Sequence, residues 1–267
     1  MSKTDQLRQA ENEFTAEGLL LEIESREGET ADGREYLQAT LTIETGENEQ
    51  HDVEMFTMKY RKDSDEVSGI YESLRTVVDE YKSVDKVGRD EADHVRIAPA
   101  SGDFTNGQLS RNDFVGQDGK VRSYPQLITT FVNRVEGEPN LHAKFETELV
   151  VDVVSEEVDK DGGETGRAIL KGYIPVYGGR VIPFDFVVNE DGAGYVLDNY
   201  EKGDTVFVYG NIVNKRIRNV RKIEGAFGAD NEKVTYSYVR EFEVTGGSEP
   251  YDEDDPKAYD PELITKA

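Results

Sequence analysis

The amino-acid sequence predicts a mainly β protein built from two tandem five-stranded Greek-key barrels, with one clear amphipathic helix in the first. Three observations lead to this prediction: short runs in which apolar and polar residues alternate, Gly-containing turn signals between those runs, and an order of elements that occurs twice. Hydrophobic residues make up 36% and charged residues 33% of the 267 positions, which indicates a globular chain with a very polar surface. This length slightly favours two structural units over one.

The first half begins with three strand patterns. Residues 19–23 and 37–43 place apolar side chains at alternate positions, and Asp32-Gly33 supplies the turn between them. Residues 51–60 give a third strand. The period then changes, because apolar residues at i, i+3, i+4 and i+7 spacing predict an amphipathic helix over about residues 64–83. Strand patterns return at residues 94–98, 108–115 and 121–135, with Asp118-Gly119 as the turn between the last two.

The second half repeats this order on a smaller scale. Strand patterns cover residues 145–158, 168–176 and 181–188, a short segment at 193–200 takes the place of the helix, and strands follow at 204–214 and 233–244. Residues 93–97, 107–109 and 119–121 can be aligned with 204–208, 210–212 and 232–234. We therefore expect a flexible N-terminus at residues 1–12, one module at 13–137, a second at 138–246 and a tail at 247–267.

The charge of the chain is strongly negative, with 31 Lys and Arg against 56 Asp and Glu and a formal net charge of -25. Such a field repels a polyanion over a Debye length of about 8 to 10 Å, so a nucleic-acid partner requires a local basic surface. Residues 249–262 hold seven acids, one base and three prolines, which predicts an acidic, disordered tail. The absence of Cys fits a reducing cytoplasm, and no apolar run reaches membrane-spanning length, so we expect no membrane contact.

A basic strip at residues 205–223 stands out against this acidic background, because it contains five Lys or Arg and no acid. The alternation places Val206, Val208 and Ile212 on a core row and Phe207 and Tyr209 on the opposite row. Aromatic rings beside basic side chains suit base stacking and phosphate contacts in single-stranded nucleic acid. The competing interpretation is that both rings pack under the helix or the neighbouring module.

Further candidates for nucleic-acid contacts lie in the strip itself and in two other places. The five basic residues of the strip are Lys215, Arg216, Arg218, Arg221 and Lys222. The predicted hairpin at residues 111–134 adds Arg111, Lys120, Arg122, Tyr124, Phe131 and Arg134, and the second module adds Lys171, Tyr173, Tyr177 and Arg180. Core packing or cover by loops is the alternative for the aromatic members of these sets.

Three segments resemble OB-fold single-stranded DNA-binding proteins. Residues 200–212 (Tyr-Glu-Lys-Gly-Asp-Thr-Val-Phe-Val-Tyr-Gly-Asn-Ile) look like the helix-to-strand passage of that family, residues 112–124 look like its basic, aromatic hairpin, and the acidic tail looks like its C-terminal tail. The resemblance implies OB-like barrels, single-stranded DNA binding without catalysis, and recruitment of replication or recombination proteins through the tail. The tail ends in Leu263-Ile-Thr-Lys-Ala267, unlike bacterial members, which favours a phage or mobile-element type acting in the host cytoplasm.

An enzyme is the weaker interpretation. None of the three His residues has a second His or a Cys at metal-ligand spacing, and no glycine-rich phosphate loop occurs, so we expect no metal and no cofactor. Two hypotheses remain. The first is sequence-tolerant binding and protection of single-stranded DNA, with RNA as a further possible ligand, in replication, recombination or repair. The second is a protein-interaction or virion structural component that uses OB-like barrels without nucleic acid.

Overall fold

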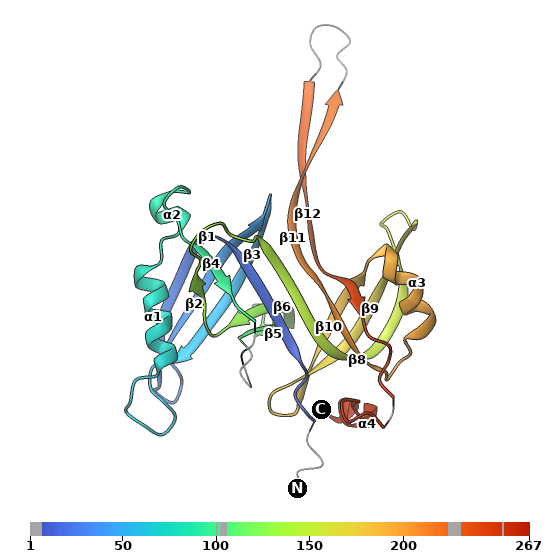
Figure 1. Ribbon diagram of the computed structural model, residues 1–267, viewed down its shortest axis with the longest axis horizontal. Coiled ribbons are helices and arrows are strands. Elements are labelled where there is room, and N and C mark those ends of the chain that lie inside the picture. The colour runs from blue at the N-terminus through green and yellow to red at the C-terminus, as the bar shows by residue number, and fades with distance from the viewer. Residues whose placement is uncertain (1–6, 100, 102–105, 224–230, 253) are drawn as a thin grey trace.

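The structure is a computed structural model that describes residues 7–99, 101, 106–223, 231–252 and 254–267, the side chains of 221–223 and 231–232 excepted. The described strands form one large mixed sheet that curls into two lobes side by side (Figure 1). The first half of the chain makes one lobe with helix α1 on its outer side. The second half makes the other lobe, with helix α3 on its outer side.

In the first lobe, β4 pairs with β1 and β6 pairs with β3. Its elements are β1 (Asn12–Glu29), β2 (Glu35–Gly46), β3 (Glu49–Met58), α1 (Gly69–Glu80), α2 (Val84–Val87), β4 (His94–Ile97), β5 (Gly107–Val115), β6 (Val121–Thr129) and β7 (Asn133–Arg134). β1, β2 and β3 form an antiparallel meander, β4 lies antiparallel to β1, and β6 lies parallel to β3.

The second lobe repeats this pairing. Its elements are β8 (His142–Val158), β9 (Glu164–Val176), β10 (Arg180–Val188), α3 (Glu190–Asn199), β11 (Thr205–Ile223), β12 (Asn231–Gly247) and α4 (Pro261–Lys266). β8, β9 and β10 form the meander, β11 lies antiparallel to β8, and β12 lies parallel to β10. The mainly β, OB-like fold predicted from the sequence is confirmed. The division of the chain at residue 137 stays a prediction.

Several predicted elements have different limits in the structure. Helix α1 begins at Gly69, because residues 59–68 form a turn in which the Ser68 and Arg61 amides donate to the Lys59 and Glu66 carbonyls. The strand predicted at 121–135 is divided into β6 and β7. The segment at 193–200 belongs to α3, whose N-cap Asn189 accepts a hydrogen bond from the Gly192 amide.

The two lobes are joined by backbone pairing in two places. Residues 12–17 of β1 pair with residues 142–147 of β8. At the other junction β11 meets β3, where Lys215 pairs with Glu49 and the Arg216 amide donates to the Asn48 carbonyl at 2.9 Å. The side-chain amide of Asn214 adds a hydrogen bond of 2.7 Å to the Gln50 carbonyl. These contacts fix the lobes relative to each other by hydrogen bonds that a single linker would not provide.

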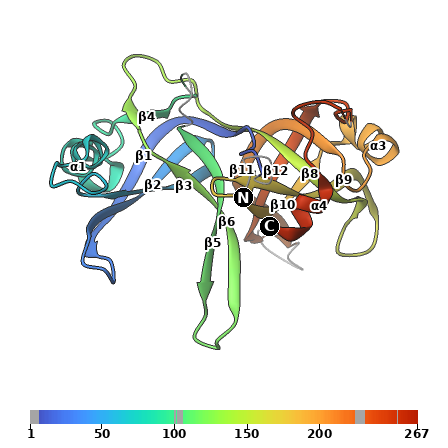
Figure 2. The same cartoon turned by 90° about the horizontal axis from the view of Figure 1, so that it is seen from below.

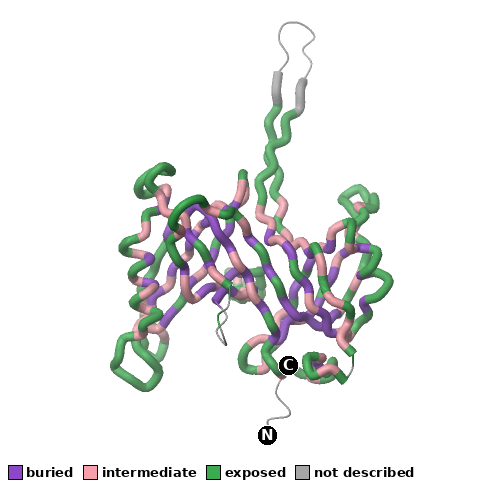
Figure 3. Tube along the Cα trace, viewed as in Figure 1, coloured by how far each residue is buried: buried purple, intermediate pink, exposed green. Residues whose placement is uncertain are grey.

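The core follows the alternation of the strands. Val206, Val208 and Ile212 are buried, as the sequence predicts for one row of β11. In the second lobe Phe184, Phe186 and Phe242 pack ring against ring with centroids 4.9 to 6.2 Å apart. Burial is concentrated in the strands of the two lobes, whereas the far part of the β11–β12 hairpin is exposed (Figure 3).

The C-terminal segment is folded, so the disorder expected for residues 247–267 is contradicted in the described residues 247–252 and 254–267. Tyr259 and Ile264 are only 7% exposed. The Tyr259 amide donates to the Thr205 hydroxyl at 2.9 Å, and its phenol donates to the buried carboxylate of Glu148 at 3.2 Å. The acidic composition predicted disorder, but the same segment contains these two buried side chains, which pack it on the second lobe.

The N-terminal segment also differs from the flexibility expected for residues 1–12. Residues 1–6 lie outside the described residues. Arg8 forms an ion pair of 2.8 Å with Glu148, and its guanidinium lies 4.6 Å from the centre of the Tyr259 ring. The amide of Ala10, which is buried, donates to the Pro175 carbonyl. Residues 7–12 therefore pack beside the C-terminal segment.

Candidate nucleic-acid interface

The five basic residues of the strip lie on a two-stranded arm, formed by residues 214–223 and 231–240. The sequence predicts a loop after residue 214, but β11 runs on to Ile223 and pairs residue by residue with β12. The loop assignment is wrong because the alternating pattern continues past Asn214 and finds its hydrogen-bonding partner in β12. The arm projects well beyond the two lobes (Figure 1).

One face of this arm combines arginine and tyrosine side chains. Arg216 and Arg218 share a face of β11, and their cross-strand partners on β12 are Tyr238 and Tyr236. The Arg216 guanidinium lies 3.7 Å from the centre of the Tyr236 ring. Tyr236 and Tyr238 are 49% and 62% exposed, so their rings are accessible. We call the residues Arg216, Arg218, Tyr236, Tyr238 and Arg240 the arm face.

The sequence analysis did not identify three members of the arm face as candidates: Tyr236, Tyr238 and Arg240. The local signal was their period of two in Thr235-Tyr-Ser-Tyr-Val-Arg240, which places them on one side of a strand. Without the register of β11 against β12, nothing connected that row to the basic strip.

The remaining basic residues of the strip are placed differently. Lys215 is exposed on the opposite side of β11 from Arg216. The side chains of Arg221 and Lys222 lie outside the described residues. The arm is tied at its base, where Arg240 donates to the Asn214 side chain at 3.1 Å.

The β5–β6 hairpin is a second projection, and it extends from the molecule in another direction (Figure 2). Phe114 and Tyr124 stack on one face of it, with ring centroids 5.8 Å apart. Lys120 is exposed at the turn, and Arg122 forms an exposed ion pair of 3.3 Å with Asp118. Arg111 donates to Ser123 and to the Pro183 carbonyl of β10, so it connects this hairpin to the second lobe.

A cleft of about 850 Å³ lies between the bases of the two projections. Asn112 and Tyr124 line it from the first, and Asn214 and Arg240 line it from the second. Lys171 also lines the cleft and pairs with Asp185 at 3.4 Å. The structure therefore brings together Arg240 of the arm face, Tyr124 and Lys171 around one cleft. Acidic side chains line it as well, so the cationic surface is strongest on the arm.

His51 forms part of the wall of this cleft. It is 3% exposed and its Nε2 atom has no hydrogen-bond partner, 4.0 Å from a carboxylate oxygen of Glu49. Burial lowers the pKa of His51 from 6.5 to about 4, although the charge of Asp52 opposes this shift. The ring is therefore neutral at pH 7.

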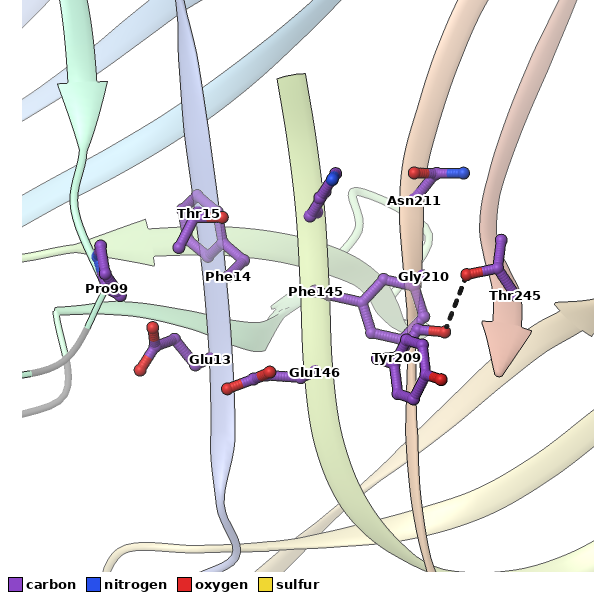
Figure 4. Close-up of a pocket in the computed structure, with 11 residues that line it drawn as sticks. Glu13, Phe14, Thr15, Pro99, Phe145, Glu146, Tyr209, Gly210, Asn211 and Thr245 are labelled. Atoms are coloured by element: carbon purple, nitrogen blue, oxygen red, sulfur yellow. Dashed lines mark hydrogen bonds between the residues drawn. The ribbon is translucent and has the colours of Figure 1, made fainter. Parts of the chain in front are cut away.

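Phe207 and Tyr209 lie in a different place from the arm face. Tyr209 is 47% exposed and lines a pocket of about 370 Å³ with Glu13 and Glu146 on neighbouring strands (Figure 4). Phe207 is half-buried, and its backbone bonds to Ser248 of the C-terminal segment. Side chains alternate along β11, so Phe207 and Tyr209, at odd-numbered positions, lie on the opposite row from Arg216.

The other predicted residues are dispersed. Arg134 lies over the Tyr81 ring at 4.3 Å and pairs with Asp93 at 3.2 Å, which holds β7 against the end of α1. Phe131 and Tyr173 are half-buried. Tyr177 is 83% exposed in the turn between β9 and β10, beside the exposed Arg180, and neither lines the cleft.

Among the described residues, no group of three or more His, Asp or Glu side chains is placed to hold a metal ion. Within the same residues, no helix combines the length and the apolar character needed to cross a membrane.

Comparisons with known proteins agree with this architecture. A family model described as YorF matches residues 10–267. A search of curated protein sequences found no match. The structure is similar to that of the wild-type single-stranded DNA binding protein from Thermus aquaticus, with 14% identity, a TM-score of 0.54 and coverage of 92% of this chain and 95% of that one. A deletion mutant of the same protein gives 14% identity and a TM-score of 0.55, covering 94% and 100%. These likenesses show the fold.

Proposed function

The chain belongs to the YorF family, and we propose that it binds single-stranded DNA with little sequence preference, protecting it during replication, recombination or repair. The likeness of the fold to the single-stranded DNA binding protein from Thermus aquaticus supports this proposal. RNA is a second possible ligand, because stacking and phosphate contacts serve both.

The observation that carries the proposal is the arm face. Arg216, Arg218 and Arg240 supply guanidinium groups for phosphates, and Tyr236 and Tyr238 supply exposed rings between them. Stacking of a base on such a ring contributes about 1 to 3 kcal/mol. Tyr238 lies opposite Arg216 and Tyr236 opposite Arg218 across the strand pair, so each ring for a base has a guanidinium for a phosphate beside it.

The net charge of -25 does not oppose binding at this surface. The arm projects away from the lobes, and strand β11 contains no acidic residue. Repulsion from the distant acids is screened over a Debye length of about 8 Å at physiological salt, whereas the phosphates contact the arm directly. In this proposal the bound DNA then continues from the arm into the cleft, where Tyr124 and Lys171 extend the binding surface.

The acidic C-terminal segment is a contact for other proteins in this proposal. Asp252 and Asp254 remain exposed although Tyr259 and Ile264 anchor the segment. We propose that replication or recombination proteins dock on this surface, in the cytoplasm of the host cell if the protein is phage-encoded.

The test is a titration with labelled oligo-dT and with a matched duplex in about 50 mM salt, followed by fluorescence anisotropy. We expect micromolar or tighter binding of the single strand and weaker binding of the duplex. Replacing Tyr236 and Tyr238 with Ala should weaken oligo-dT binding by roughly 5- to 150-fold per ring. Tyr195→Ala is the matched control, because Tyr195 is 45% exposed on α3, outside the cleft.

The alternative function is a protein-interaction or virion structural component. Failure of the wild-type protein to bind oligo-dT at micromolar concentration would refute the proposed function and favour that alternative. Equal losses in the arm variant and in Tyr195→Ala would place the binding surface elsewhere.

A further inference from the structure

The end of the β5–β6 hairpin is apolar on both of its faces. Val115 and Val121 are cross-strand partners in its last residue pair and are 68% and 73% exposed. Phe114, 42% exposed, occupies the opposite face one residue earlier. These three side chains form a small apolar surface at the end of a projecting hairpin, where another molecule can reach them.

The hairpin is held in a defined shape. The Gly116 amide donates to the Lys120 carbonyl, and the Gly119 amide closes the turn on the Gly116 carbonyl. Gly119 adopts a positive φ of 75°, which favours glycine at this position of the turn. Behind the tip, Phe114 stacks on Tyr124, and this pair stiffens the two strands.

The surroundings of the tip favour nucleobases as its partner. Lys120 and Arg122 are the sequence neighbours of Val121. Tyr124, which stacks on Phe114, also lines the cleft at the base of the arm. Apolar side chains that enter between base steps separate them at a cost of a few kcal/mol per step.

We propose that this hairpin tip acts as a wedge at the junction between single-stranded and double-stranded DNA. Val115 and Val121 insert against the terminal base pair, and Phe114 covers the base released on the other side. Lys120 and Arg122 hold the phosphates of the separated strand. The inference rests on the proposed function, since the neighbouring single strand occupies the cleft and the arm, and it adds an activity that single-strand binding does not require.

The experiment uses the full chain and a duplex with a single-stranded overhang. 2-Aminopurine reports opening at the first base pair from the junction, and a second duplex carries it at an interior pair. The test variant is Val115→Thr with Val121→Thr, because threonine keeps the β-branched shape and replaces a methyl group with a hydroxyl. The control is Val153→Thr with Val158→Thr on β8, where the valines are 44% and 59% exposed. Melting temperatures of both variants should match the wild type.

We expect the wild type and the β8 control to raise fluorescence at the first pair and not at the interior pair. The tip variant should lose this signal by at least fivefold while its affinity for oligo-dT stays within twofold of the wild type. Equal opening by the tip variant, or no opening by the wild type despite normal oligo-dT binding, overturns the wedge alone. Absence of oligo-dT binding by the wild type overturns the proposed function together with the wedge.

Discussion

The side of β11 on which a basic residue lies should determine its effect on the salt dependence of binding. Arg216 belongs to the arm face, whereas its neighbour Lys215 lies on the opposite side of the same strand. Each phosphate neutralised on a single strand contributes about -0.7 to the slope of log K against log salt. Arg216→Gln should therefore reduce the magnitude of the slope by about 0.7, and Lys215→Gln should leave it almost unchanged.

The full arm face gives a larger effect. Replacing Arg216, Arg218 and Arg240 with Gln removes three phosphate contacts, so the magnitude of the slope should fall by about 2. The slope is a better measure of phosphate contacts than the affinity. Arg216 also lies over the Tyr236 ring, so its loss disturbs base stacking, and that effect changes the affinity without changing the number of counterions released. Tyr236→Ala should show the converse, with a lower affinity and an unchanged slope.

The assay is an oligo-dT titration followed by fluorescence anisotropy at several salt concentrations from about 50 to 300 mM. Lys160→Gln, in the exposed turn between β8 and β9, controls for the loss of one charge far from the arm. Equal changes in slope for Lys215→Gln and Arg216→Gln would refute the assignment of the arm face. If the affinity of the wild type did not depend on salt, the arm would make no phosphate contacts.

Three further predictions concern stability. Ile264→Ala should lower the free energy of unfolding by roughly 2 to 3 kcal/mol in a urea titration, because Ile264 is 7% exposed and anchors α4. The pKa of His51 is lowered to about 4, so below pH 6.5 the unfolded chain binds a proton at this residue that the folded chain does not bind. The free energy of unfolding of the wild type should therefore fall between pH 6.5 and 4. The fall should exceed that of His51→Leu by up to about 3 kcal/mol. Gly210→Ala should lower the melting temperature measured by circular dichroism, because a Cβ there would overlap the Glu243 carbonyl oxygen.

Each stability prediction has an outcome that contradicts it. An unchanged urea midpoint for Ile264→Ala would mean that the C-terminal segment is not docked in solution. Parallel pH profiles of the wild type and His51→Leu would show that His51 titrates normally. Normal melting of Gly210→Ala would require β12 to move away from residue 210. Gly194→Ala is the control, because a Cβ at Gly194 meets nothing within 4 Å.

The sequence predicted the strands well because alternation is a local property. A strand with one buried face repeats its apolar residues every second position, and Val206, Val208 and Ile212 of β11 do so. The same reasoning could not place the end of β11. Continuation past Asn214 depends on hydrogen bonds to β12, and those partners lie at residues 231–240, across a turn whose length the local pattern does not fix.

The candidate site was predicted in part for the same reason. Composition identified the basic strip, and Arg216 and Arg218 belong to the arm face. It also grouped Phe207 and Tyr209 with that strip, although alternation places them on the other row of β11 from Arg216. The disorder expected at the C-terminus failed because composition averages a segment, whereas docking depends on single anchors such as Tyr259.

The sequence by itself determined the mainly β fold, the core row of β11 and the concentration of basic residues in an acidic chain. Each of these is set by side chains close together along the chain. The tertiary structure decided that Tyr236 and Tyr238 stand beside Arg216 and Arg218, that the arm and the β5–β6 hairpin border one cleft, and that the chain ends pack together. These arrangements depend on strand register, bulges and the pairing of distant segments, which are fixed when backbone hydrogen bonds and apolar surfaces of the whole chain are satisfied at once.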